Sequence, residues 1–149
     1  MAPLPEYRGC NQFSFAIADG KTEFGTTVHK MEQNIDGGDI LFERRFPIPF
    51  NCWVEELYQL TFDASLDLFI ETLPAILAGN YPLQAQKDLI PSRGTSIHYR
   101  NEIHALKQID LSLSKEEIEK RIRATAMPGF EPPFCIVNDE KLYFSKTWQ

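Results

Sequence analysis

The hydrophobic pattern of the first fifty residues predicts one short helix followed by two strands. Residues 11–19 have apolar positions at helical spacing and end at a glycine. Alternating and β-branched residues predict a strand over 25–31, and a second apolar run predicts another over 39–48. The connection between these strands is short, which favours an antiparallel or steeply angled pair.

A longer apolar pattern predicts a helix from a cap at Asn51 to about Ala78. Pro74 falls inside it, so the helix either kinks or restarts there. The stripe that we expect to form core contacts consists of Trp53, Leu57, Leu60, Ala64, Leu68, Leu73 and Leu77. This helix is expected to be the hydrophobic anchor of the first half of the chain.

Prolines and a glycine make residues 81–96 look irregular, and we interpret them as a linker. The linker divides the chain into a first domain over residues 1–80 and a C-terminal subdomain over 81–149. A weak helical pattern follows near residues 101–108.

The C-terminal subdomain carries the clearest local signals. Ser114 and Glu117 form a capping box, which predicts a helix that ends near Met127. Two β-rich runs, Phe134–Val137 and Lys141–Phe144, predict a hairpin across a short polar turn.

Composition is ordinary for a globular protein, with 43% hydrophobic and 24% charged residues in a chain of 149. No apolar run approaches the ~20 residues of a membrane span, and no secretory signal opens the sequence. Cys10, Cys52 and Cys135 lie far apart without metal-ligand spacing. We therefore expect reduced thiols, a cytoplasmic protein, no membrane partner and no metal.

The net charge of −6 is unevenly distributed along the chain. Residues 1–79 hold 5 Lys and Arg against 12 Asp and Glu, whereas residues 80–149 hold 10 against 9. Neither part is strongly basic, which makes nucleic acid an unlikely partner.

The strongest candidate chemistry lies in the turn Asn34-Ile35-Asp36-Gly37-Gly38-Asp39-Ile40. A glycine-rich turn next to a strand can hold a catalytic carboxylate rigidly, but Asp-Gly also marks ordinary hairpins, and local chemistry favours the plain turn. His29 is interpreted as a structural residue on one strand face. Arg8, in a proline-rich loop, is either a surface arginine or a group offered to an anion.

Three ordered motifs resemble the formyltransferase family, which moves a formyl group from 10-formyltetrahydrofolate to an amine. They are Leu4-Pro5-Glu6-Tyr7-Arg8-Gly9, Gly25-Thr26-Thr27-Val28-His29 and Ile35-Asp36-Gly37-Gly38-Asp39-Ile40. The tail, with Arg121-Ile122-Arg123-Ala124, Pro128-Gly129-Phe130 and a hairpin to Trp148, is most similar to nucleotide-sugar N-formyltransferases. Methionyl-tRNA formyltransferase is a relative.

The resemblance implies an α/β fold, in which the C-terminal half of a Rossmann-like formyltransferase domain precedes a small α+β tail ending in a β-hairpin. It implies that Asp36 is the catalytic aspartate and that 10-formyltetrahydrofolate is the co-substrate. Asn34, Ile35 and Asp36 are then expected to contact the folate. The expected contacts to the amine substrate, a nucleotide-linked amino sugar, are Tyr7, Arg8 and Gln12.

The family's catalytic Asn-x-His pair lies immediately before its Leu-Pro-x-Tyr-Arg-Gly run. Here Met1 precedes that run, so we expect an N-terminally truncated member that is inactive by itself. An incomplete sheet exposes an edge and an apolar face, so we expect a homodimer through the sheet or the C-terminal hairpin. The alternatives are a methionyl-tRNA formyltransferase-like protein, or a non-catalytic dimerisation or binding module.

Overall fold

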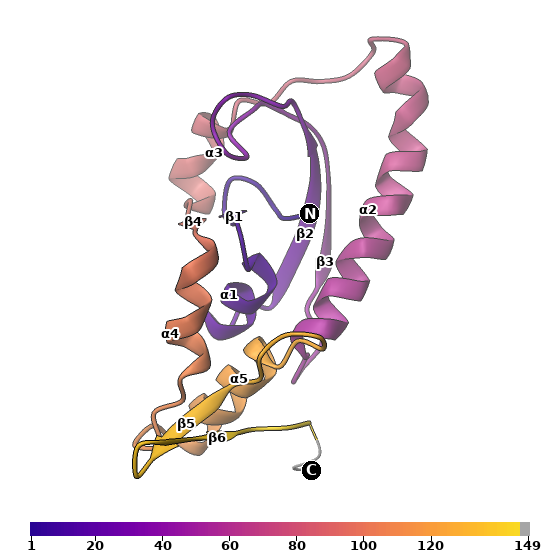
Figure 1. Ribbon diagram of the computed structural model, residues 1–149. Helices are drawn as coiled ribbons and strands as arrows, with labels where there is room; N and C mark the ends of the chain where they lie inside the picture. Colours follow the sequence, from indigo (N-terminus) through magenta and orange to yellow (C-terminus); the bar gives the residue numbers. More distant parts are fainter. Residues whose placement is uncertain (147–149) are drawn as a thin grey trace.

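The computed structural model describes residues 1–146, and its centre is a long antiparallel ribbon (Figure 1). Strand β2 (Glu23–His29) pairs with β3 (Ile40–Pro47), so that Phe24 lies opposite Phe46. Helix α1 (Gln12–Ala18) precedes the ribbon, as the sequence predicts. The two predicted strands and their antiparallel pairing are confirmed.

Helix α2 (Val54–Leu77) is one continuous element that lies along one side of the ribbon (Figure 1). It runs through Pro74 without restarting. The predicted cap was wrong, because the N-cap residue is Trp53 and Asn51 lies ahead of the helix. The Glu56 carboxylate accepts a hydrogen bond of 2.7 Å from the backbone N–H of Trp53 and so satisfies one exposed donor at the helix start.

The predicted core stripe of α2 is only half correct. Leu57 and Leu68 are buried, but Leu60 is 39% exposed and Leu77 is 79% exposed. For Leu77, the last residue of α2, the reason is geometric, since the helix approaches the ribbon at its N-terminal end and diverges from it toward its C-terminal end (Figure 1). A two-stranded ribbon covers too little area to bury both ends of a helix of this length.

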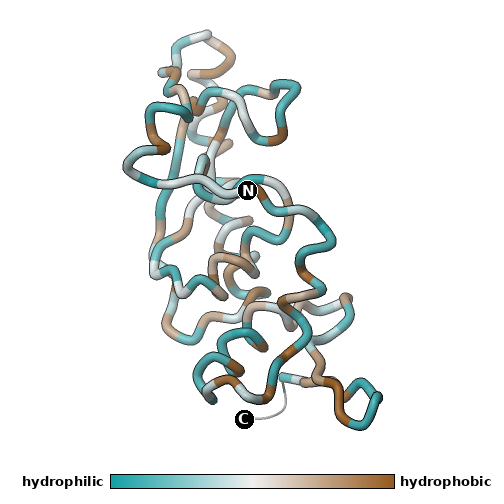
Figure 2. The backbone as a smooth tube through the Cα atoms, turned by 90° about the vertical axis from the view of Figure 1, so that its left-hand side faces the viewer, coloured by the Kyte–Doolittle hydropathy of each residue, from teal (hydrophilic) through white to brown (hydrophobic). Residues whose placement is uncertain are grey.

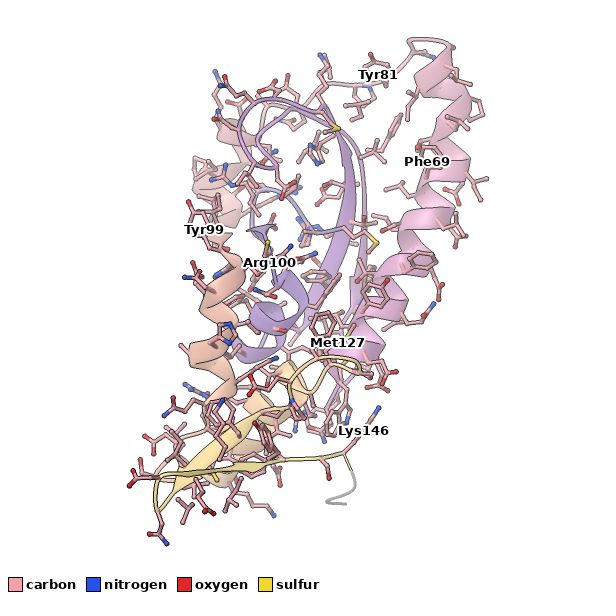
Figure 3. All side chains as sticks on the ribbon, in the orientation of Figure 1. Phe69, Tyr81, Tyr99, Arg100, Met127 and Lys146 are labelled. Carbon is pink, nitrogen blue, oxygen red and sulfur yellow. The ribbon has the colours of Figure 1, made fainter. Side chains whose placement is uncertain are left out.

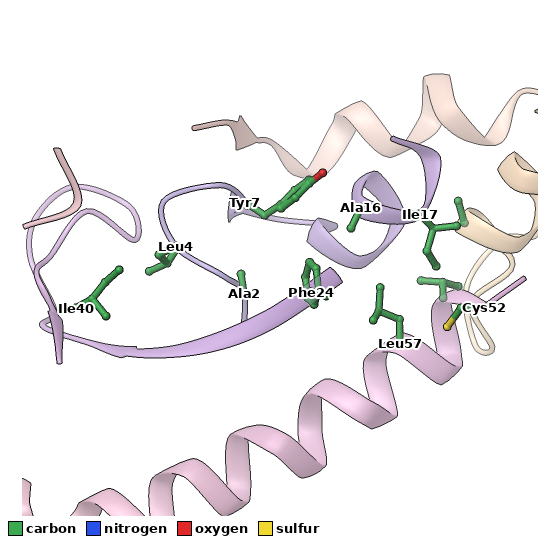
Figure 4. Close-up of a cluster of buried hydrophobic side chains, with 11 residues drawn as sticks. Ala2, Leu4, Tyr7, Ala16, Ile17, Phe24, Ile40, Cys52 and Leu57 are labelled. Atoms are coloured by element: carbon green, nitrogen blue, oxygen red, sulfur yellow. The ribbon is translucent and has the colours of Figure 1, made fainter. Parts of the chain in front are cut away.

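The core lies where α1, β2 and the start of α2 meet (Figure 4). Phe24 is fully buried there, with its ring centroid 5.7 Å from Phe13 and 5.9 Å from Tyr7. Leu4 and Leu57 complete the cluster from the N-terminal loop and from α2. The cluster joins aromatic and aliphatic side chains, and the burial of their apolar area is the main favourable term in folding.

The segment predicted to be irregular is ordered, and that prediction was wrong. It contains α3 (Gln86–Arg93), and strand β4 (Ile97–His98) follows it directly. Strand β4 pairs in parallel with β1 (Arg8–Gly9), and Gln84 exchanges two backbone hydrogen bonds of 2.9 Å with Ile40. Backbone hydrogen bonds to residues far away in the sequence thus order this segment, although its local sequence pattern predicts a linker. The division into domains at residue 80 stays a prediction.

The C-terminal elements follow the sequence closely. A short 3₁₀ turn η1 (Arg100–Glu102) leads into α4 (Ile103–Lys107), and α5 (Lys115–Thr125) packs against α1. Ser114 accepts a hydrogen bond from the Glu117 N–H, which confirms the predicted cap.

The chain then ends in a hairpin of β5 (Phe134–Val137) and β6 (Glu140–Tyr143), also as predicted. The family-like tail was expected to extend to Trp148, which lies outside the described residues. Hydrophobic and hydrophilic positions alternate in short segments along the backbone (Figure 2). Accordingly, no helix within residues 1–146 has the length and apolarity needed to cross a bilayer.

Candidate active site

The Asp36 turn connects β2 to β3 and has a backbone that few residues could adopt. Asp36 itself has a φ of 48°, in the left-handed region, which aspartate tolerates better than most residues. A Cβ at Gly38 would lie 2.0 Å from the carbonyl oxygen of Lys30, so only glycine fits there. A hydrogen bond of 2.9 Å from the Lys30 N–H to the Asp39 carbonyl closes the turn.

The Asp36 carboxylate is held by the backbone of a different element. The Gly9 N–H donates a hydrogen bond of 2.8 Å to Asp36 Oδ2. Gly9 has a φ of 89°, and a Cβ at this position would lie 2.3 Å from the carbonyl oxygen of His98. The loop that carries Tyr7 and Arg8 is therefore fixed against both Asp36 and β4.

His29 lies beside Asp36, an arrangement that the sequence reasoning missed. Its Nε2 is 3.8 Å from Asp36 Oδ1, while its Nδ1 is 2.9 Å from the Lys30 carbonyl oxygen. A carbonyl oxygen can only accept, so Nδ1 carries a proton and Nε2 faces the carboxylate. The position of His29 at the last residue of β2, just before the turn, is the only sequence signal that could have indicated this contact.

Gln86 fastens the Asp36 turn from α3, and the sequence reasoning also missed it. Its Nε2 donates hydrogen bonds of 2.7 Å to the carbonyl oxygens of Asp36 and Gly38. The side chain is buried, and its Oε1 has no hydrogen-bond partner. No sequence signal marks Gln86, because it comes from a segment that looks irregular and lies fifty residues from Asp36.

The three residues expected to contact the amine substrate have different surroundings. Tyr7 is buried in the core and donates a hydrogen bond of 2.7 Å to Asp19, and burial together with this bond raises the pKa of its hydroxyl. Arg8 Nε is buried and has no hydrogen-bond partner. Gln12 donates to the carbonyl oxygen of Met1 at 3.1 Å. Arg8 is therefore the charged member of this set with a buried donor that is not used.

The N-terminal residue lies close to Asp36. Burial lowers the pKa of the Met1 α-amino group, and the negative charge of Asp36 opposes that shift. Asn34 and Ile35 form the exposed part of the same turn, where the Asn34 carbonyl accepts a hydrogen bond from the Gly37 N–H at 3.2 Å. Their folate contacts and the substrate contacts of Tyr7, Arg8 and Gln12 stay predictions.

Chemically, the turn presents a carboxylate that is oriented by a backbone donor and flanked by an imidazole. Such a carboxylate can accept a proton from a bound amine or orient a neighbouring catalytic group. Within residues 1–146, no cluster of three or more histidine, cysteine, aspartate or glutamate side chains could hold a metal ion. The three cysteines are free thiols.

Solved structures identify the fold. The chain resembles the N-formyltransferase from Helicobacter canadensis, with 25% identity and a TM-score of 0.79, over 94% of this chain and 50% of that one. A 4-N formyltransferase from Francisella tularensis has a TM-score of 0.85 over 97% of this chain and 58% of that one, at 19% identity. The chain therefore has the α/β fold found in formyltransferases.

The sequence comparisons agree with that class. Residues 2–73 match the family described as formyl transferase, and this part of the chain belongs to that family. A methionyl-tRNA formyltransferase from Levilactobacillus brevis is 32% identical over 121 residues, which are 81% of this chain and 37% of that protein. The chain thus spans well under half of this relative's length.

Proposed function

We propose that this chain supplies the Asp36 part of an active site that transfers a formyl group from 10-formyltetrahydrofolate to an amine. The observation that carries the proposal is the fixed Asp36 carboxylate, held at 2.8 Å by the Gly9 N–H within the segment that matches the family. In this reaction the amine nitrogen bonds to the formyl carbon and the bond from that carbon to the folate nitrogen breaks. The amine loses a proton and the folate nitrogen gains one.

Asp36 receives the proton of the attacking amine, directly or through a neighbouring histidine. Negative charge develops on the formyl oxygen during the attack and needs hydrogen-bond donors. In the family those donors are an asparagine and a histidine of an Asn-x-His pair. We propose that this pair belongs to the part of a formyltransferase that the chain does not cover. The support is that the chain spans only 37% of its Levilactobacillus brevis relative.

Folate is the proposed formyl donor, with the exposed residues Asn34 and Ile35 as its contacts beside Asp36. The support comes from the Helicobacter canadensis structure, which is a complex with folinic acid and dTDP-3-aminofucose. The same complex supports a nucleotide-linked amino sugar as the amine substrate. Arg8, with its unpartnered buried Nε, is then the residue offered to the anionic part of that substrate.

Methionyl-tRNA is the second candidate substrate, because the similar curated sequences are methionyl-tRNA formyltransferases. The formal charge of the chain, −6, disfavours an RNA substrate, since such binding depends on basic surface. We therefore favour the amino sugar.

The proposal includes a homodimer and a cytoplasmic location. The outer side of α2 exposes Phe62, Leu66 and Phe69, which form an apolar strip at helical spacing (Figure 3 labels Phe69). Apolar strips of this kind are usually covered by another protein surface. Sedimentation at several concentrations measures this self-association.

Formyl transfer is measured with an extended protein in which an upstream Asn-x-His is restored. We expect that protein to formylate a dTDP-linked amino sugar, and Asp36→Asn to remove most of the activity while leaving the melting temperature within a few degrees. The matched control, Asp39→Asn, changes an acid of the same turn and should keep activity. Full activity in Asp36→Asn rejects the role of Asp36.

The chain of 149 residues alone is expected to be inactive, because losing one oxyanion donor typically costs about 10²–10³ in rate. Transfer by this chain at the rate of the extended protein would contradict the proposed role of the Asn-x-His pair. Titration with folinic acid distinguishes a formyltransferase site from a non-catalytic module. A non-catalytic module would bind neither folate nor nucleotide-sugar but would self-associate.

A further inference from the structure

A cavity lies at the opposite end of the molecule from the Asp36 turn. Its volume is about 580 Å³, and it opens between the start of α2, one side of α5 and the segment after β6. Figure 3 shows Lys146 at this end and Tyr81, which follows α2, at the other. The side chains that matter most are Asn51, Trp53, Ile118, Ile122, Arg123 and Lys146.

Arg123 is the unusual residue of this cavity. Its Nε is buried and has no hydrogen-bond partner, and no carboxylate within residues 1–146 forms an ion pair with its guanidinium. Its neighbours on α5 differ, since Arg121 pairs with Glu117 at 2.9 Å and Lys120 pairs with Glu117 at 2.7 Å. Burying part of a cation without a partner costs free energy, which an anionic ligand would recover.

Arg123 and Asn51 also line a smaller cavity of about 370 Å³ on their other side. Lys21 lines that cavity, and no ion pair within the described chain engages it. The two cavities therefore meet at Arg123. The junction carries more positive than negative charge, although the whole chain is acidic. A local positive potential of this kind concentrates small anions.

The aromatic lining of the cavity suits a flat ring. Trp53 and Phe144 line it together with Arg123, and Lys146 Nζ lies over the Trp53 indole, 5.3 Å from the ring centroid. Ile118 and Ile122 form an apolar floor along α5. Ring stacking on tryptophan adds affinity beyond the burial of apolar area.

We propose that this cavity binds a small organic anion, whose carboxylate or phosphate group contacts Arg123 and whose flat ring lies against Trp53. The site contains none of the residues of the Asp36 turn. It therefore stands or falls independently of the proposed formyl transfer.

Calorimetry and amide NMR on the 149-residue chain test this site with three probes: uridine monophosphate, benzoate and inorganic phosphate. We expect saturable binding of a ring-bearing anion, with the largest shifts in α5 and in the Trp53 indole N–H. Arg123→Gln should weaken binding about tenfold or more, because it removes a charge-assisted contact. The matched control is Arg100→Gln, which removes one positive charge from an exposed residue of η1 outside the cavity (Figure 3) and should bind normally.

A second variant tests the ring. Trp53→Leu should bring the affinity of the ring-bearing anions down to that of inorganic phosphate. Tighter binding of uridine monophosphate than of benzoate identifies a phosphate-linked ring as the natural class, and the reverse identifies a carboxylate. Both outcomes uphold the site.

Several results would overturn the proposal. They are the absence of saturable binding by any ring-bearing probe, unchanged affinity in Arg123→Gln, and shifts confined to the Asp36 turn. If Arg123→Gln melts early, Arg123→Lys keeps the charge and should still bind, so the test passes to Trp53→Leu, in which normal binding of the ring-bearing anions rejects the site.

Discussion

The Asp36 turn and the Arg123 cavity treat their charged groups in opposite ways. At the turn, the carboxylate accepts a backbone hydrogen bond, faces His29 and sits on a loop that Gln86 holds by two carbonyls. At the cavity, Arg123 Nε is buried without a partner beside open volume. The first arrangement holds a functional group in one orientation, whereas the second leaves a charge available to a ligand. The preorganised carboxylate of Asp36 and the unpartnered donor of Arg123 thus lie at different ends of the same small chain.

The largest expected effect is on the turn. Gly38→Ala should destabilise the protein by about 3 kcal/mol, because the new methyl group would overlap the Lys30 carbonyl oxygen, a rigid backbone atom. Urea denaturation measures this change. The control is Gly79→Ala, where φ is +68° but no atom lies within 4 Å of the added Cβ, so about 1 kcal/mol is expected. Equal costs in the two variants would show that the turn is not tightly closed.

The next largest effect concerns Gln86 of α3, which donates two hydrogen bonds to the Asp36 turn. Gln86→Ala should cost about 2 kcal/mol, because two buried carbonyl groups lose their hydrogen bonds. Amide hydrogen exchange should then increase around Asp36 and leave α5 unchanged. Gln84→Ala is the matched control, since its exposed side chain donates a hydrogen bond to the adjacent Ala85 carbonyl and none to the Asp36 turn within residues 1–146. If both variants behave alike, Gln86 does not hold the turn.

A smaller change tests the cavity end. Ser114→Ala removes the side chain that caps α5 and should cost about 1 kcal/mol. Because α5 carries Arg123, this variant should also loosen the cavity, which exchange at α5 amides reports. Ser112→Ala, on the same loop and exposed, should have no comparable effect. If the α5 amides stay protected from exchange in Ser114→Ala, the cap does not influence the cavity.

The smallest expected effect is a loss of stability at alkaline pH, caused by the Cys52 thiol near Arg123. Burial, and then the charge of Glu56, raises the pKa of Cys52 from 9.0 to about 11, while the charge of Arg123 lowers it. The folded state therefore holds the thiol proton more tightly than the unfolded state. The resulting stabilisation is complete below about pH 9 and is lost as the pH rises through about 11.

Denaturation at several pH values between 8 and 11.5 measures this loss. Cys52→Ala should flatten the profile over that window, whereas Cys135→Ala, which removes another buried thiol, should keep the loss. If the loss of stability persists unchanged in Cys52→Ala, groups other than Cys52 cause it.

Sequence reasoning located the elements whose signals are local. The two strands, the Ser114 cap and the C-terminal hairpin all followed from short patterns of side chains. Local chemistry at the turn favoured a plain Asp-Gly turn, and only the resemblance to formyltransferases singled out Asp36, whose catalytic role stays a prediction. Sequence reasoning failed for α3 and for the outer half of α2, where backbone partners and the reach of the ribbon decided the outcome.

The sequence by itself determined the elements with strong local signals, which are α1, α2, α5, the β2–β3 ribbon and the C-terminal hairpin, and the glycine-rich turn that carries the Asp36 carboxylate. These depend on backbone propensity, hydrophobic period and glycine, all of which act within a few residues. Only the tertiary structure decided what surrounds each charged group. Gly9, His29 and Gln86 meet at Asp36, while Arg123 meets a cavity, because long-range packing of β1, α3 and α5 brings distant residues together. No local sequence pattern predicts these contacts, since they depend on how whole helices and strands pack around one core.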